Sequence, residues 1–432
     1  MKNLFSKVIS VVVMTMLLLT ASCAIKLPST GTDSTNGHVI KASAAYKATL
    51  TAQKIAAFPD AFVSGINQYG WTVASGLYNG ENLAISPASL ELAILMTRTG
   101  AAGATANEMK TALSMSALSD EDILSSCRQL MWRANTNGME AANSIWMQKD
   151  YSFSDAFIKS CTDNFMTDAF AVDFLKDAAG ATDSINKWAS DKTHGKISEM
   201  NPDPLSPDTR LVLINALYFL GDWEIPFTAE NSYDQVFHGT QKDASVKFMH
   251  DTRNMLYAET SSYQMISLPF KGAEGKADSP YSMAFILPAE GQDVTAVMKD
   301  LASNGFTTAA AGLADAKVQL ALPKYEFTFD ASMQKTMESL GMKLAFDPEK
   351  AQFDGMTGAA NDLFISDILH KCYIRVDEKG AEAAAVTEVI METTAMPVEE
   401  DLKTFNADRP FLFAIYDETD KTVLFLGAVG QL

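Results

Sequence analysis

Residues 380–396 contain no proline and alternate in character. The glutamates of this stretch occupy even positions, and its odd positions are uncharged: Ala381, Ala383, Ala385, Thr387, Val389, Met391 and Thr393. A period of two is typical of a β-strand with one buried face, and without proline every backbone N–H can join a sheet. Periodicity alone also allows an ordinary amphipathic strand or an Ala-rich helix, because alanine is a strong helix former.

Helical patterns dominate the first half of the chain, and strand patterns dominate the second half. Helices are predicted at residues 90–96, 106–113 and 181–193, and strands at 211–219, 281–287, 411–416 and 423–426. The run 211–219 is continuously apolar, which predicts a strand covered on both faces. This order of elements indicates an α+β fold.

Charge and motif content exclude several function classes. The net charge of −19 disfavours nucleic acid and other polyanions as partners. None of the five histidines has a second His or Cys at ligand spacing, so no metal site is predicted. Nucleotide, cofactor and hydrolase motifs are absent, and we expect neither a cofactor nor an enzyme, although a Ser/His/Asp triad need not leave a sequence signature. The cysteines Cys127, Cys161 and Cys372 are expected to be buried thiols.

The N-terminus is predicted to be an export signal. Lys2 and Lys7 precede an apolar run and the small residues that lead to Cys23. The ending resembles a bacterial lipoprotein cleavage box, which implies that residues 1–22 are removed and that Cys23 carries lipid. Residues 23–50 then form a tether of roughly 30 Å, and residues 51–432 form the folded domain. The expected location is the periplasmic or outer face of a bacterial membrane, and the alternative is a plain secretory signal.

Several segments together resemble one protein family. Glu378-Lys379-Gly380, Glu382 and Ala383-Ala384-Ala385 resemble the proximal hinge of inhibitory serpins, although Ala381 stands where the family usually has Thr or Ser. Similar segments follow in family order over about residues 55–432, among them Asn82–Leu90, Ala142–Trp146, Ile185–Trp188, Thr193–Ile197, Asn215–Phe219, Leu268–Phe270, His370-Lys371 and Phe405–Phe413.

The resemblance implies one domain of three β-sheets with eight or nine helices, and an exposed reactive-centre loop at about residues 378–400. A serine or cysteine peptidase would attack the loop and be trapped in a 1:1 covalent complex while the cut loop inserts into the central sheet. The inhibitor itself would be a monomer. The alternative is a non-inhibitory serpin that acts as a binding protein.

The resemblance also assigns roles to individual residues. The scissile bond would join Thr394 and Ala395. The polar residues Ser86, Ser89, Asn215 and His370 would form the network beneath the strands that open, and Trp223 would lie where the loop enters the sheet.

The composition of the loop predicts its target class. No Lys or Arg lies between Lys379 and Lys403, and no aromatic residue lies between Tyr373 and Phe405. The expected targets are therefore elastase-like or subtilisin-like peptidases that prefer small or aliphatic residues. Glu392 makes a glutamate-specific peptidase a less favoured alternative. Because the chain is acidic, its association rate should be higher with a basic peptidase than with an acidic one.

Overall fold

The structure is a computed structural model, and it describes residues 38–40, 57–200, 203–219, 221–272, 278–358, 363–380 and 402–432. Several predicted features lie outside these residues: the signal segment 1–22, Cys23, the hinge positions 381–385, and the bond between Thr394 and Ala395. No helix of the described part is long and apolar enough to cross a membrane.

Several of the described helices begin at a polar side chain that caps them. They are α2 (Asp60–Leu77), α3 (Pro87–Arg98), α4 (Gly103–Ala112), α5 (Asp120–Thr136), α6 (Asp155–Phe165), α7 (Ala178–Lys192), α8 (Val294–Asp300), α9 (Phe306–Ala311), α10 (Gln334–Ser339) and α11 (Asp354–Thr357). Ser86 caps α3 by accepting a hydrogen bond from the Ser89 N–H, and Pro87 takes the first helical position. A capping box of Ser119 and Asp122 starts α5. The helices predicted at 90–96, 106–113 and 181–193 correspond to α3, α4 and α7.

The strands within the described part form three sheets. They are β1 (His38–Ile40), β2 (Leu83–Ile85), β3 (Met139–Gln148), β4 (Thr167–Val172), β5 (Leu211–Phe219), β6 (Ser232–His238), β7 (Asp243–Glu259), β8 (Tyr263–Lys271), β9 (Asp278–Pro288), β10 (Ala314–Pro323), β11 (Tyr325–Ser332), β12 (Leu369–Val376), β13 (Lys403–Asn406), β14 (Phe411–Asp417) and β15 (Val423–Val429). The sheet orders are β1-β4-β3-β5, then β13-β10-β7-β8-β9-β14-β15-β2 with β6 on β7, and β11-β12. The predicted α+β class and three sheets are confirmed.

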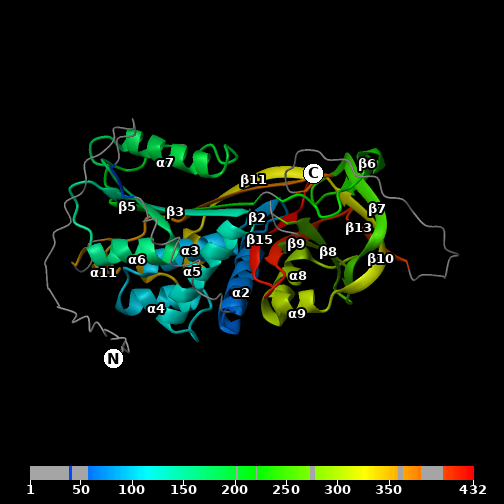
Figure 1. The fold of residues 1–432 in the computed structure, drawn as a ribbon, viewed down its shortest axis with the longest axis horizontal. Helices are drawn as coiled ribbons and strands as arrows, with labels where there is room; N and C mark the ends of the chain where they lie inside the picture. Colours follow the sequence, from blue (N-terminus) through cyan, green and yellow to red (C-terminus); the bar gives the residue numbers. More distant parts are fainter. Residues whose placement is uncertain are drawn as a thin grey trace, which may run out of the picture. The chain divides into compact units, whose positions relative to one another are not determined.

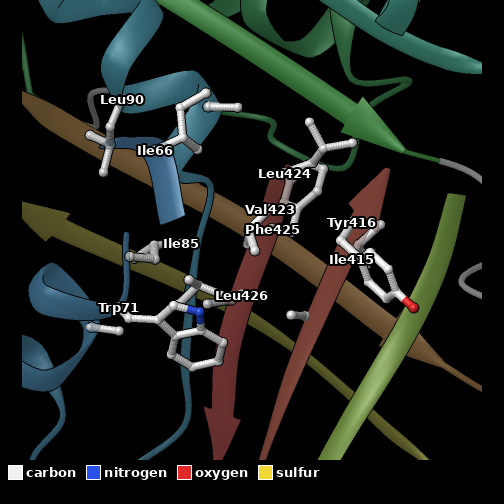
Figure 2. Packing of buried hydrophobic residues seen from close by; sticks show 14 of the residues in the cluster. Ile66, Trp71, Ile85, Leu90, Ile415, Tyr416, Val423, Leu424, Phe425 and Leu426 are labelled. Atoms are coloured by element: carbon white, nitrogen blue, oxygen red, sulfur yellow. The ribbon is translucent and has the colours of Figure 1, made fainter. Parts of the chain in front are cut away.

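The largest sheet carries the core. Every residue of β14 and β15 is buried, and the two strands pair as the predicted hairpin. Helix α2 packs against β15, and its Trp71 is fully buried. Figure 2 shows Trp71 beside Leu426 of β15 and Ile85 of β2. Burying a side chain of this size contributes on the order of 3 kcal/mol, so this end of the molecule is firmly anchored.

The four-stranded sheet lies between helices. Figure 1 shows α7 on one face of β3 and β5, and α3, α5 and α6 on the other face. Helix α3 packs against both β5 and β15, and it therefore connects the two larger sheets.

A short strand lies within the segment 23–50, for which the sequence predicts a tether. His38–Ile40 form β1 and pair antiparallel with Ala169–Ala171 of β4. Val39 and Ile40 are β-branched residues that favour strands, and β4 would otherwise present an open edge.

Candidate functional site

The strands β5 and β12 border an open gap, which we call the β5–β12 gap. Within the described residues, no strand pairs with β5 on its side away from β3, or with β12 on its side away from β11. A cavity of about 840 Å³ is lined by residues 211–215 of β5, by residues 363–370 at the start of β12, and by Ser89. At the other end the chains meet in a bridge between Asp222 and Gly380. Both strands run from the cavity to this bridge, so they are parallel.

The gap accounts for the partial burial of β5. Helices pack on both faces of this strand, as its apolar run predicts, but most of its residues are only partly buried, Ile214 and Ala216 being the exceptions. Among the described strands, β5 has a partner along one edge only, and the cavity lies along the other edge. An apolar strand edge without a partner exposes unpaired backbone N–H and C=O groups, which can pair with a further strand.

The closed end of the gap is built around Trp223, which is almost fully buried. Its backbone N–H donates to the Lys379 carbonyl at 2.7 Å, and its indole N–H donates to the Asp377 carbonyl at 2.9 Å. The indole stacks on Phe270 with ring centroids 4.8 Å apart. These contacts hold the end of β12 against the chain that follows β5, at the place predicted for loop entry.

Gly380 and Glu378 belong to the same closed end. A Cβ atom at position 380 would lie 2.0 Å from the carbonyl oxygen of Gly221, so only glycine fits this close approach. The carboxylate of Glu378 pairs with Lys324 at 2.7 Å, and its carbonyl accepts a hydrogen bond from the Phe227 N–H. The two described hinge residues therefore fix the point from which the loop departs.

Three of the four predicted network residues meet at the open end. The Ser86 N–H donates to Nε2 of His370 at 3.0 Å, and the Ser86 hydroxyl donates to the Leu424 carbonyl at 2.7 Å. The Ser89 N–H donates to the Ser86 hydroxyl at 3.1 Å. Burial lowers the pKa of His370 to about 4, so the imidazole is neutral at pH 7 and can accept the Ser86 hydrogen bond. The thiol of Cys372 lies 3.2 Å from the same Nε2 atom.

The fourth predicted residue, Asn215, lines the same cavity but forms a different hydrogen bond. Its Nδ2 donates to Oδ1 of Asn143 on β3 at 2.7 Å, and Asn143 in turn donates to the Phe165 carbonyl. The Asn215 Oδ1 atom is buried without a hydrogen-bond partner among the described residues. Sequence reasoning placed Asn143 in a family segment but gave it no role, because a single asparagine on a strand carries no sign of its cross-strand partner.

A further contact set crosses the gap on the side of α7. The ammonium group of Lys196, in the segment after α7, lies 5.2 Å from the centre of the Tyr373 ring on β12. The Lys371 ammonium group donates to the Glu199 carbonyl at 2.8 Å. Since α7 itself packs against β3 and β5, this segment connects the two sides of the gap. Lys196 and Lys371 were part of family-like segments, and the structure shows what they contact.

The remaining titratable groups do not form a catalytic or metal centre. No group of three His, Cys, Asp or Glu side chains suited to a metal ion occurs within the described ranges. Cys127, Cys161 and Cys372 are buried free thiols, and burial raises the pKa of each. What the site offers is a strand-sized opening next to the start of a proline-free loop.

Comparisons with known proteins agree with this architecture. Among curated proteins, an uncharacterized serpin-like protein of Thermococcus kodakarensis is 33% identical over 370 residues, which is 84% of each chain. Serpin B6 of Macaca fascicularis is 33% identical and covers 82% of this chain and 94% of its own. The leukocyte elastase inhibitor of Xenopus laevis is 32% identical and covers 80% and 92%.

Solved structures show the same fold. The thermophilic serpin tengpin in its native state is 30% identical, with a TM-score of 0.78 over 88% of this chain and 96% of that chain. A cleaved serpin named 42Da is 26% identical, with a TM-score of 0.77 over 87% of this chain and all of that chain. The predicted serpin fold is confirmed. The family model described as "Serpin (serine protease inhibitor)" matches residues 65–432, and the chain therefore belongs to the serpin family of inhibitors and is not an enzyme.

Proposed function

We propose that this protein is a single-use inhibitor that traps serine peptidases, and some cysteine peptidases, by inserting its cut loop into the β5–β12 gap. The observation that supports this most directly is the parallel course of the two strands, with the loop leaving from Gly380 at their shared end. A chain that reverses direction after Gly380 runs antiparallel to both strands. It can therefore form antiparallel ladders on both of its edges.

The loop has the length and pattern for such an insertion. From Gly380 to Thr394 it would extend roughly 46 Å at about 3.3 Å per residue, which exceeds the length of β5. The uncharged odd positions can face the interior on the side of α3, and the glutamates at even positions can face solvent. Asn215, whose Oδ1 lacks a partner among the described residues, lies on the path of the inserted strand.

In the proposed reaction, the catalytic serine or cysteine of the peptidase attacks the carbonyl carbon of Thr394. The bond to Ala395 breaks, Ala395 leaves as a free amine, and Thr394 remains as an acyl-enzyme ester or thioester. The freed loop inserts after the contacts of Trp223 at the closed end separate, and it carries the peptidase with it. Ser86, Ser89, Asn215 and His370 act as the network that allows the strands to separate.

The proposed targets are elastase-like and subtilisin-like peptidases. The loop lacks basic and aromatic residues, so a peptidase must accept Thr, Ala, Val, Ile or Met at its specificity pocket. One relative carries the name leukocyte elastase inhibitor, which is consistent with a family member that meets this class of peptidase.

Incubation with elastase and with trypsin tests both the trap and its specificity. We expect an SDS-stable 1:1 complex with elastase and a released C-terminal peptide that begins at Ala395 by intact mass. Trypsin should be inhibited little or not at all, and the variant Thr394→Arg should reverse this preference because it supplies a basic residue at the scissile bond.

Three outcomes would contradict parts of the proposal. Stoichiometric cleavage without a complex would indicate a non-inhibitory serpin. A peptide that begins outside residues 391–397 would refute the assigned bond. Faster inhibition of trypsin than of elastase by the unchanged chain would refute the target class.

We further propose that Cys23 carries lipid and anchors the mature protein to a bacterial membrane on its periplasmic or outer face. The support is the sequence of the export signal, with residues 1–22 removed and a polar segment following Cys23. Several acyl chains on one residue give firm anchoring, whereas a single chain does not. The Cys23→Ser variant should move from the membrane fraction to the soluble fraction, and an unchanged distribution would refute the anchor.

A further inference from the structure

The strand β13 follows closely after the reactive-centre loop, at one edge of the largest sheet. It pairs with β10 over only four residues. Figure 1 shows β13 near β6, β7 and β10 at one end of the molecule. A short strand at the edge of a sheet opens easily, so side-chain contacts matter for how firmly β13 is held.

A row of hydrogen-bonded side chains connects β13 to β6 and β7. Nδ2 of Asn406, the last residue of β13, donates to Oδ2 of Asp408 at 2.8 Å. Nε2 of Gln235 on β6 donates to Oδ1 of Asn406 at 2.8 Å. Oε1 of Gln235 lies 3.2 Å from Nε2 of His250 on β7. We call these four residues the Asp408–His250 row.

The carboxylate of Asp408 fixes the direction of every hydrogen bond in the row. A carboxylate only accepts, so Asn406 must point its amide NH₂ at Asp408 and its amide oxygen at Gln235. Gln235 must then point its NH₂ at Asn406 and its oxygen at His250. An amide oxygen also only accepts, and the row is therefore complete only when Nε2 of His250 carries a hydrogen.

The other ring nitrogen of His250 has the same requirement. Nδ1 lies 3.2 Å from the Asn231 carbonyl oxygen and 3.1 Å from the Phe248 carbonyl oxygen, and both oxygens can only accept. A neutral imidazole has one N–H, whereas a protonated imidazole has two. The ring of Tyr233 stacks on the imidazole with centroids 3.8 Å apart, which also favours a positive charge there.

No rearrangement of the row satisfies a neutral ring. If Gln235 turned its NH₂ towards His250, its oxygen would face the oxygen of Asn406. If Asn406 turned as well, its oxygen would face the carboxylate of Asp408. A neutral ring with its hydrogen on Nε2 completes the row but leaves Nδ1 against two carbonyl oxygens. One contact is therefore lost whenever His250 is neutral.

Other charged groups near His250 do not enter the row. On β10 the residue opposite His250 is Ala321, and its neighbours on that face are Gln319 and Pro323, so this strand presents no charge to the ring. The charged side chains of the surrounding elements include the pairs Asp234–Lys247, His238–Asp243, Asp251–Arg253, Lys324–Glu378 and Asp408–Arg409, together with Glu230 before β6 and Lys403 on β13.

We propose that His250 is a proton-dependent latch, which holds β13 to β6 when its ring is protonated and loosens β13 when its ring is neutral. Histidine ordinarily changes charge between about pH 5 and 8, a range in which carboxylates stay ionised. The latch sets how firmly the C-terminal end of the reactive-centre loop is held before cleavage. That consequence rests on the proposed function, whereas the latch itself does not.

Hydrogen exchange of the full, uncut chain without any peptidase tests the latch. Mass spectrometry follows the amides of residues 403–406 at about pH 5.5 and about pH 8.0, with each rate divided by the intrinsic rate at that pH. We expect the protection of β13 to be about tenfold greater at the lower pH. The buried strand β14 is the internal reference and should show no such gain. The predicted effect of His370 weakens the fold at low pH and cannot produce this gain.

Three variants identify the group that responds to pH. His250→Gln supplies an amide donor that does not titrate, so the protection of β13 should be the same at both pH values. Gln235→Leu interrupts the row and should leave β13 weakly protected at both. His238→Gln, at an exposed histidine of β6, is the matched control and should keep the pH response. The ¹⁵N shifts of the histidine rings should show His250 titrating over the range in which β13 loosens.

Three results would overturn the proposal: protection of β13 that does not depend on pH in the unchanged chain, the same pH response in His250→Gln, or loss of the response in His238→Gln. Melting temperatures check that each variant folds, and Gln235→Leu gives the same test if His250→Gln does not fold. A failure to trap elastase would refute the proposed function alone, because the exchange measurement involves no peptidase.

Discussion

The two ends of the β5–β12 gap are built in opposite ways. At the closed end, Trp223 is buried and donates two hydrogen bonds to the chain after β12. At the open end, β5 and the start of β12 line a cavity of about 840 Å³. The loop begins at the closed end, yet the space that would hold it lies at the open end. In the proposed mechanism, the barrier to insertion and the gain from insertion are therefore located at different places along the same pair of strands.

Under the proposed mechanism, this separation explains how the folded protein can keep the β5–β12 gap. Insertion would first break the bridge of Asp222 with Gly380 and the hydrogen bonds of Trp223, and it would gain the new ladders only afterwards. A state that is unfavourable overall can persist when the first step towards the favourable state is costly. The following predictions test this contrast between the two ends.

Cleavage of the loop within residues 390–396 should have the largest effect. The freed strand would fill the open end and pair with β5 and β12 at once, so the melting temperature should rise on the order of 20 °C. Differential scanning calorimetry before and after cleavage measures the change. A melting temperature that stays the same or falls would show that the gap is not a site of stored free energy.

Changes in the hinge should stop insertion at the closed end. Ala383→Arg places a charge at an inward-facing position, and Ala385→Pro removes a ladder hydrogen bond, so each should lower the yield of the peptidase complex at least about tenfold and increase turnover as a substrate. The melting temperature of the uncut protein should barely change.

The matched control for the hinge is Glu382→Gln, at an even position that would face solvent after insertion. It should leave the complex yield near that of the unchanged chain. Full complex formation by Ala383→Arg and Ala385→Pro would refute insertion as the trapping step.

The smallest predicted effect concerns pH at the open end. His370 is neutral in the folded state at pH 7 because burial lowers its pKa to about 4. In the unfolded chain the imidazole has its ordinary pKa of 6.5 and takes up a proton below that pH. The free energy of unfolding therefore falls by at most about 3 kcal/mol as the pH drops from about 6.5 to about 4. When the ring is protonated, the Ser86 N–H loses its hydrogen-bond acceptor.

Urea unfolding at pH 7.0 and pH 4.5 measures this effect. The free energy of unfolding should fall by about 2 kcal/mol more in the unchanged chain than in His370→Gln, which can accept the Ser86 hydrogen bond but does not titrate. His194→Gln, at an exposed histidine, is the control and should behave like the unchanged chain. Equal pH dependence in the unchanged chain and His370→Gln would show that His370 does not cause the loss of stability at low pH.

Local elements were predictable from the sequence, and their partners were not. The apolar run 211–219 predicted β5 with its correct bounds, and the hairpin of β14 and β15 was predicted from two apolar runs around a polar turn. Periodicity reports which residues of one element are buried, but it carries no information on whether a strand edge has a partner. The open edge of β5 was therefore missed.

The site residues show the same limit. The family resemblance selected Ser86, Ser89 and His370, which do meet, but it could not show that Asn215 pairs with Asn143 instead.

The short strand β1 changes how far the protein could range from an anchor. With lipid at Cys23, as proposed, the first described contact with the folded domain is at His38 on the edge of β4, 15 residues from the anchor rather than 27. A flexible linker of 15 residues would span roughly 20 Å on average, against roughly 30 Å for 27 residues. Because effective concentration varies with about the −3/2 power of linker length, the inhibitor would meet peptidases at the same membrane surface roughly twice as often.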